Sequence, residues 1–117
     1  MSKEIRQMID KVKNFKQFIN ENKMYNEGEL TFVKPYELGK PIELDSDVLT
    51  LIDEIKTNKW VVPISITKDG RIVDGQHRYS ALIELGVNKI PVYIGKQLGS
   101  SGRLEKVYDG LPIPIEI

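Results

Sequence analysis

The stretch RIVDGQHRYSALIELG, residues 71–86, constrains the fold more than any other part of the chain. An apolar run ends in Asp74-Gly75, and apolar residues then recur at three- and four-residue steps up to Gly86. This order predicts a strand, a tight turn and a helix of about two turns over residues 78–85, closed by a left-handed glycine. The turn also carries the only histidine of the chain, His77, beside Arg78.

The predicted turn has the chemistry of a phosphate site. The first N–H groups of a helix have no partner inside it, and the helix dipole places partial positive charge there. Gly75 lets a ligand approach the backbone closely, Arg78 offers a bidentate cationic donor, and His77 can donate to a phosphate or relay a proton. We expect an anion site here, most naturally for a nucleotide phosphate. The structural alternative is a glycine that only permits the turn, an arginine in a salt bridge and a histidine that caps the helix.

Three further residues, Asp74, Trp60 and Tyr79, have two interpretations each. Asp74 could hold Mg²⁺ or a ribose hydroxyl, or its side chain could cap the following helix. Trp60 and Tyr79 could stack on a base, but both stand in apolar patterns where packing in the core is the commoner role.

The rest of the chain reads as short elements of both kinds. Four apolar runs bounded by turn residues predict strands: LTFV, WVVPISIT, RIV and KIPVYI. Asp69-Gly70 lies between two of these runs and predicts a hairpin. Asp45, Ser46 and Asp47 open a helix that runs towards Asn58, with acidic residues where the helix dipole favours them.

These elements divide the chain into three segments. Residues 1–26 are expected to form an amphipathic helix, residues 27–95 an α/β core, and residues 96–117 a loop and tail. The first helix either covers the sheet or mediates self-association as a homodimer. Its basic face suits nucleic acid or is simply solvated. The last seven residues, LPIPIEI, fit an edge strand or a docking segment.

Composition limits the partners and the compartment. Seventeen basic residues balance seventeen acidic ones, so the chain has no bulk attraction to nucleic acid or to an anionic membrane. The absence of cysteine excludes disulfides, thiolate metal sites and cysteine nucleophiles, and it fits a reducing cytoplasm. No apolar run approaches the roughly 20 residues of a membrane span. We expect a cytoplasmic protein without a membrane partner or a secretion signal.

The segment IVDGQHRYSALIELGVNKIPVYI resembles the central motif of the ParB/sulfiredoxin-like superfamily. In that superfamily a strand leads to Gly-x-x-Arg, then to a short helix with a small residue (here Ala81), a glycine and an Ile-Pro-Val strand. The order upstream is also similar, so that the resemblance covers roughly residues 30–94. It implies an α/β (α+β) fold: a small, mixed, partly open sheet with short flanking helices, to which this chain adds its N-terminal helix.

Two branches of that superfamily do not fit. Sulfiredoxins carry their catalytic cysteine between the glycine and the His-Arg pair, where this chain has Gln76 and no cysteine. Chromosome-partitioning ParB proteins bind CTP through Gly-x-x-Arg, but they add a Glu-Asn-type phosphate motif and a helix-turn-helix domain. Neither feature follows Arg78, so we do not expect DNA clamping of the ParB type.

Two other branches are closer in motif. Free-serine kinases carry Asp-Gly-His-His-Arg at the turn and a general base in a Lys-Pro-x-Glu loop. The chain has DGQHR and KPYE, which would place that base at Glu37, although Gln76 departs from the pattern. The alternative for Glu37 is an exposed glutamate beside a proline turn. A further group of proteins, associated with DNA modification, shares the pentapeptide DGQHR itself.

The resemblance implies function of two kinds. The first is a Mg²⁺-dependent kinase or ATPase that uses ATP or another nucleotide, with Glu37 and His77 as catalytic residues. Its phosphate-binding residues would be Asp74, Gly75, Gln76, His77 and Arg78. The second is a ParB-like nuclease, or a DNA-binding regulatory module of a phage or mobile element. A degenerate domain that binds a protein partner is a third hypothesis.

Overall fold

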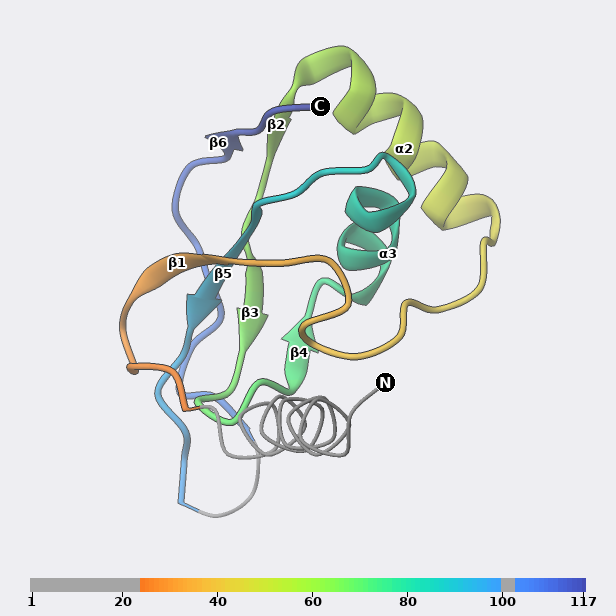
Figure 1. The fold of residues 1–117 in the computed structure, drawn as a ribbon. Coiled ribbons are helices and arrows are strands. Elements are labelled where there is room, and N and C mark those ends of the chain that lie inside the picture. Colours follow the sequence, from red (N-terminus) through yellow and green to blue (C-terminus); the bar gives the residue numbers. More distant parts are fainter. Residues whose placement is uncertain (1–23, 100–102) are drawn as a thin grey trace, which may run out of the picture.

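Two apolar segments, ISI and IPVYI, form the centre of the larger sheet in the computed structural model, which describes residues 24–99 and 103–117 (Figure 1). Strands β3 (Ile64–Ile66) and β5 (Ile90–Ile94) pair in parallel. At one edge β1 (Leu30–Val33) runs antiparallel to β5, and at the other β4 (Ile72–Asp74) runs antiparallel to β3. The order is therefore β1-β5-β3-β4, a mixed sheet as expected.

Helix α2 (Ser46–Asn58) begins where the acidic residues predict. Asp45 is its N-cap, and the Oδ1 of Asp45 accepts a hydrogen bond from the Val48 N–H at 2.9 Å. The helix ends at Asn58, and its C-cap, Lys59, adopts the left-handed conformation. A cap of this kind fixes the start of a helix because it satisfies a backbone donor that has no partner inside the helix.

Helix α3 (Gln76–Glu84) starts two residues earlier than the apolar pattern predicts. Gly75 is its N-cap, so Gln76 and His77 belong to its first turn rather than to the preceding loop. Gly86 has a φ of 75°, which confirms the left-handed glycine expected after the helix.

The run WVVPISIT does not form the single strand expected. It is divided into β2 (Trp60–Val61) and β3, which belong to different sheets. Pro63, between them, has no N–H to donate to a ladder, and the chain changes partners there.

Strand β2 pairs instead with the C-terminal segment. Trp60 lies opposite Pro114 and Val61 opposite Ile113, in β6 (Ile113–Pro114). This confirms the edge-strand alternative for LPIPIEI. Ile115, next to β6, joins the hydrophobic core.

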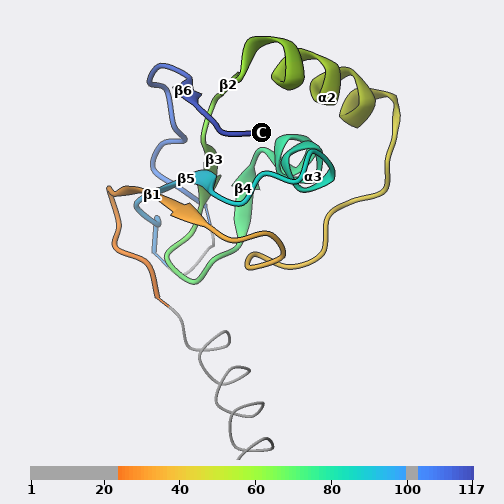
Figure 2. The same cartoon turned by 45° about the horizontal axis from the view of Figure 1, so that its top comes forward.

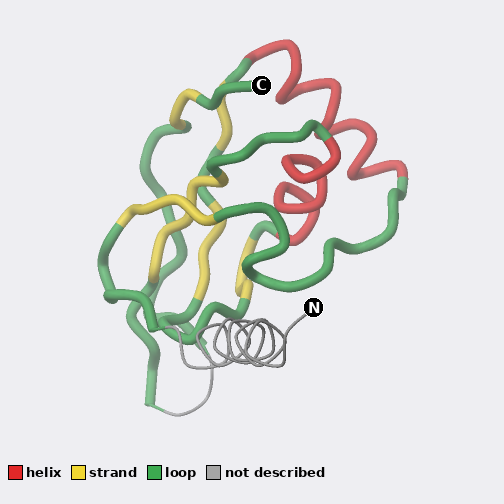
Figure 3. Tube along the Cα trace, viewed as in Figure 1, coloured by secondary structure: helices red, strands yellow, loops and turns green. Residues whose placement is uncertain are grey.

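Both helices lie on the same side of the larger sheet (Figures 2 and 3). Helix α2 packs on α3, and α3 contacts β3. Tyr79 of α3 is fully buried in this core, where its hydroxyl donates to the carbonyl of Gly39 at 2.7 Å. Among the described residues, neither helix has the length and apolar character that crossing a membrane requires.

The fold is thus α+β, with two helices, a mixed four-stranded sheet and a small two-stranded sheet in the described part of the chain. The N-terminal helix expected in residues 1–26, and the homodimer interface assigned to it, fall outside the described residues up to residue 23. Residues 24–26 are not helical.

Candidate functional site

The turn between β4 and α3 requires glycine. Gly75 has a φ of 107° and a ψ of 24°, a conformation that is unfavourable for residues with a Cβ. A Cβ there would lie 2.9 Å from Nη2 of Arg78 and 3.2 Å from Cγ1 of Ile64. The glycine therefore serves two needs, the backbone conformation and the close approach of the Arg78 side chain.

Helix α3 begins without a side-chain cap among the described residues. The interpretation of Asp74 as the cap is therefore wrong. Because the N-cap is a glycine, no side-chain oxygen is available to the first N–H groups of the helix. The Oδ2 of Asp74 lies instead 3.2 Å from Nη2 of Arg78, four residues along the chain.

Both hydrogen bonds of the Arg78 side chain that the described residues show come from Nη2. Its side chain is 22% exposed, and its Nη2 also donates to the carbonyl of Pro63 at 3.5 Å. Nε of Arg78 is buried and has no hydrogen-bond partner among the described residues. An arginine has five N–H donors, and Nη2 makes both contacts, so the guanidinium keeps donors for a further acceptor.

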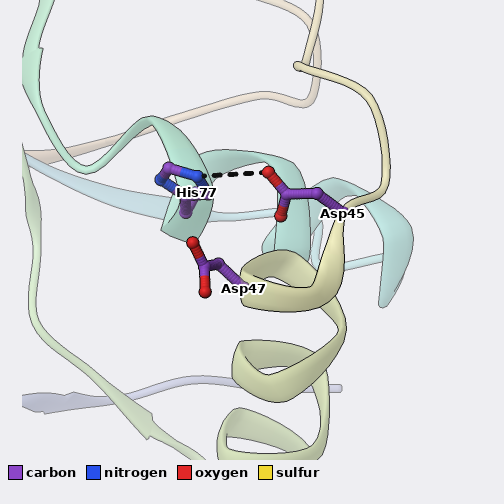
Figure 4. A group of neighbouring side chains, drawn as sticks. All are labelled: Asp45, Asp47 and His77. Carbon is purple, nitrogen blue, oxygen red and sulfur yellow. Dashed lines mark ion pairs between the residues drawn. The ribbon is translucent and has the colours of Figure 1, made fainter.

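His77 faces the start of α2 (Figure 4). Its Nε2 lies 3.5 Å from Oδ2 of Asp45, and Asp47 points towards the same imidazole. The pKa of Asp45 is lowered, first by the Val48 N–H that its side chain accepts and then by His77. One potential ligand atom from each of Asp45, Asp47 and His77 lies within 4.8 Å of the others. Two carboxylates and an imidazole at this spacing could hold a divalent cation.

Asp47 and His77, but not Asp45, line a pocket of about 410 Å³, which we call the turn pocket. It is lined by all five residues predicted to bind phosphate, and by four residues of α2: Asp47, Thr50, Leu51 and Glu54. Three of its side chains are carboxylates, and Arg78 is its one permanent cation. An anion alone would meet repulsion there, whereas an anion with a divalent cation would not.

Glu37 has a different environment. Its carboxylate accepts a hydrogen bond from the Tyr25 hydroxyl at 2.6 Å and from the Lys34 N–H at 3.2 Å. Burial, and then the hydrogen bond to Glu37, raise the pKa of Tyr25 well above its ordinary value. Burial raises the pKa of the Tyr79 hydroxyl, and the nearby Glu37 carboxylate contributes to the rise. Of the two predicted catalytic residues, His77 lines the turn pocket and Glu37 does not.

Sequence reasoning missed the contribution of α2 to the site. The sequence suggests a part in the site for none of Asp45, Asp47 and Glu54. Asp47 follows Asp45 by two residues and Glu54 follows Asp47 by seven, so all three belong to one helix and its N-cap. The packing of α2 on α3 is what brings them to the turn.

Comparisons with known proteins give no match: no family model, no curated protein and no solved structure is similar to this chain. The likeness to the ParB/sulfiredoxin-like superfamily therefore stays a prediction from the order of motifs. The chemistry of the site follows from its own geometry.

Proposed function

We propose that the chain is a ParB/sulfiredoxin-like domain that binds a nucleotide by its phosphates at the turn pocket. Its activity would be Mg²⁺-dependent phosphoryl transfer or nucleotide hydrolysis. The observation that carries the proposal is the convergence of an uncapped helix start, a glycine turn and Arg78 on one pocket. Backbone N–H groups and a guanidinium are the donors that phosphate oxygens accept best.

The carboxylates in and beside the pocket favour a cation-dependent reaction. Asp45, Asp47 and His77 would hold the cation, and Asp74 already offsets part of the charge of Arg78. A bound divalent cation neutralises the charge that develops on the phosphoryl oxygens.

The turn pocket is lined by one imidazole, that of His77, and imidazole is the side chain that most often acts as a general acid or base. His77 would accept the proton of the attacking water or hydroxyl, or its neutral imidazole would be a ligand of the cation. The role of Glu37 as general base rests on the KPYE resemblance alone. In the structure Glu37 accepts hydrogen bonds within its own loop and from Tyr25.

A ParB-like nuclease is the second candidate, and the cluster of Asp45, Asp47 and His77 is the observation that favours it. Metal-dependent phosphodiester cleavage needs carboxylate-bound cations at an accessible surface, and this cluster is accessible. The carboxylates near the turn oppose the binding of a bare polyanion, which places this candidate second.

Phosphate release from ATP, ADP, CTP and GTP with Mg²⁺ tests the proposed function. His77→Asn should lower the rate by about 10²-fold or more if His77 moves the proton. Glu37→Gln should leave it nearly unchanged, and Arg71→Ala, which removes an exposed arginine outside the pocket, is the matched control. If Glu37→Gln loses activity and His77→Asn does not, the general base is Glu37 in the KPYE loop rather than His77. Nicking of plasmid DNA without nucleotide hydrolysis would favour the nuclease.

A further inference from the structure

A second pocket continues the turn pocket along α2. It has a volume of about 450 Å³ and lies between the second half of α2 and β2. The two pockets share three lining residues, Leu51, Glu54 and Arg78. Because these residues line both, the two pockets adjoin each other, and we call the pair the α2 groove.

The far end of the α2 groove is apolar and aromatic. Trp60 lines it, together with Ile55, Val61 and Pro112. Trp60 is 53% exposed, while its neighbour Val61 is buried. In a tryptophan of the core, both faces of the indole are covered by other side chains. Trp60 is half exposed, so part of its aromatic surface is accessible to a ligand. Of the two aromatic residues with a possible stacking role, Tyr79 is in the core and Trp60 is in the groove.

We propose that the α2 groove binds the base of the nucleotide, with the base stacked on Trp60. This inference rests on the proposed function, because the phosphates of the same nucleotide occupy the turn pocket. Aromatic side chains stack on any base, since every base has a π-face. The groove is therefore a site for a nucleotide rather than for inorganic phosphate or a phosphorylated metabolite without a ring.

The polar residues of the groove suit the same ligand. Asn58, beside Trp60, offers both a donor and an acceptor to the edge of a base. Glu54 lies at the junction of the two pockets, where the sugar would be, and a carboxylate accepts hydrogen bonds from ribose hydroxyls. Asp47 to Asn58 spans about 16 Å of helix at 1.5 Å per residue, a length that accommodates a base, a sugar and phosphates in line.

Trp60 is the only tryptophan of the chain, so tryptophan fluorescence, excited where tyrosine does not absorb, reports on this position alone. We would titrate the full chain with ATP and CTP, and with tripolyphosphate as the base-free probe, all in the presence of Mg²⁺. Each nucleotide should quench Trp60 saturably, whereas tripolyphosphate should bind without comparable quenching. Binding would be followed in parallel by calorimetry, which does not depend on the indole.

Variants of Trp60 separate stacking from folding. Trp60→Ala should weaken nucleotide binding roughly tenfold and leave tripolyphosphate binding unchanged. Trp60→Phe should restore most of the loss, because it keeps an aromatic face. Phe32→Ala is the matched control, since Phe32 is 52% exposed and lies outside the groove. Circular dichroism of each variant shows whether it is folded.

Two results would overturn the inference in different ways. If nucleotides and tripolyphosphate bind equally tightly, without quenching and without an effect of Trp60→Ala, the base site is wrong and the phosphate site stands. If neither nucleotides nor tripolyphosphate bind, the proposed function fails and the base site fails with it.

Discussion

Nε2 of His77 lies 3.5 Å from Oδ2 of Asp45, and the other oxygen of the same carboxylate caps α2 (Figure 4). One aspartate thus joins the first turns of both helices that border the turn pocket. Both side chains are about half exposed, 45% for His77 and 50% for Asp45, so their ion pair adds little to stability. Its value is positional, because it holds the imidazole beside the carboxylates.

The two roles of Asp45 can be separated by substitution. Asp45→Ala removes the cap and should lower the free energy of unfolding, while Asp45→Asn keeps a good capping oxygen and should lower it much less. Both variants lose the charge beside His77, so both should weaken the binding of Mn²⁺ or Mg²⁺. Urea unfolding and metal titration measure the two effects. Equal destabilisation by Ala and Asn would contradict the capping role.

Stability should fall in acid for a reason that the structure identifies. The pKa of Asp45 is lowered by the Val48 N–H and His77, and that of Asp69 by the Thr67 hydroxyl, both from an ordinary value of 3.8. A carboxyl whose pKa is lower in the folded state stabilises the fold above its unfolded pKa, and this stabilisation is lost as pH falls through the folded pKa. Urea unfolding from pH 7 to pH 2 should therefore show a loss below about pH 4. The loss should be smaller in Asp45→Asn, and an unchanged profile would contradict the account.

Gly75→Ala should be damaging in a way that conformation alone does not explain. Gly39 has a nearly identical φ of 108°, but a Cβ there would have no atom within 4 Å, whereas at Gly75 it would meet Arg78 and Ile64. Both substitutions introduce strain of about 1 kcal/mol or more, and Gly75→Ala adds the displacement of Arg78. Chemical unfolding should give a lower free energy of unfolding for Gly75→Ala than for Gly39→Ala. The reverse order would mean that the Arg78 side chain does not depend on this close approach.

The bond between Tyr25 and Glu37 predicts an alkaline transition. Burial and Glu37 raise the pKa of Tyr25 above 10.0, so the protonated phenol stabilises the fold fully below pH 10, and this contribution is lost as pH rises through the folded pKa. Tyr25→Phe should lower stability at pH 7 by about 1 kcal/mol and reduce the alkaline loss. Unfolding at pH 7 and pH 11 measures both. A variant with the same pH dependence as the wild type would contradict the role of Tyr25.

Local features of the site could be predicted from the sequence, and long-range ones could not. Gly75, Gly86 and the Asp45 cap depend on neighbours within a few residues, and the structure has each of them at a turn or a helix end. The apolar pattern places the start of α3 two residues too late, because Gln76 and His77 are polar and do not contribute to that pattern. The division of WVVPISIT at Pro63 depends on which segments pair, and β6 comes from the far end of the chain.

The composition of the pocket shows the same limit. Glu37 and the turn are linked by a motif resemblance, but Glu37 is occupied by Tyr25 and Lys34. Glu54 and Asp47 enter the pocket because α2 packs on α3, and no local pattern encodes that contact. Trp60 and Tyr79 stand in similar apolar patterns, yet one is exposed and the other buried.

The central claim is that Arg78 and the start of α3 bind nucleotide phosphates. The most direct measurement is the melting temperature with ATP, ADP, CTP and GTP, each with and without Mg²⁺, for the wild type, Arg78→Ala, Arg78→Lys and the control Arg71→Ala. A ligand at 100 times its Kd stabilises the fold by about 2.7 kcal/mol, which raises the melting temperature by several degrees.

We predict a Mg²⁺-dependent rise with at least one nucleotide in the wild type and in Arg71→Ala. The rise should be absent in Arg78→Ala and reduced in Arg78→Lys, which keeps the charge but loses the bidentate geometry. No rise with any nucleotide, or an equal rise in wild type and a folded Arg78→Ala, would contradict the claim.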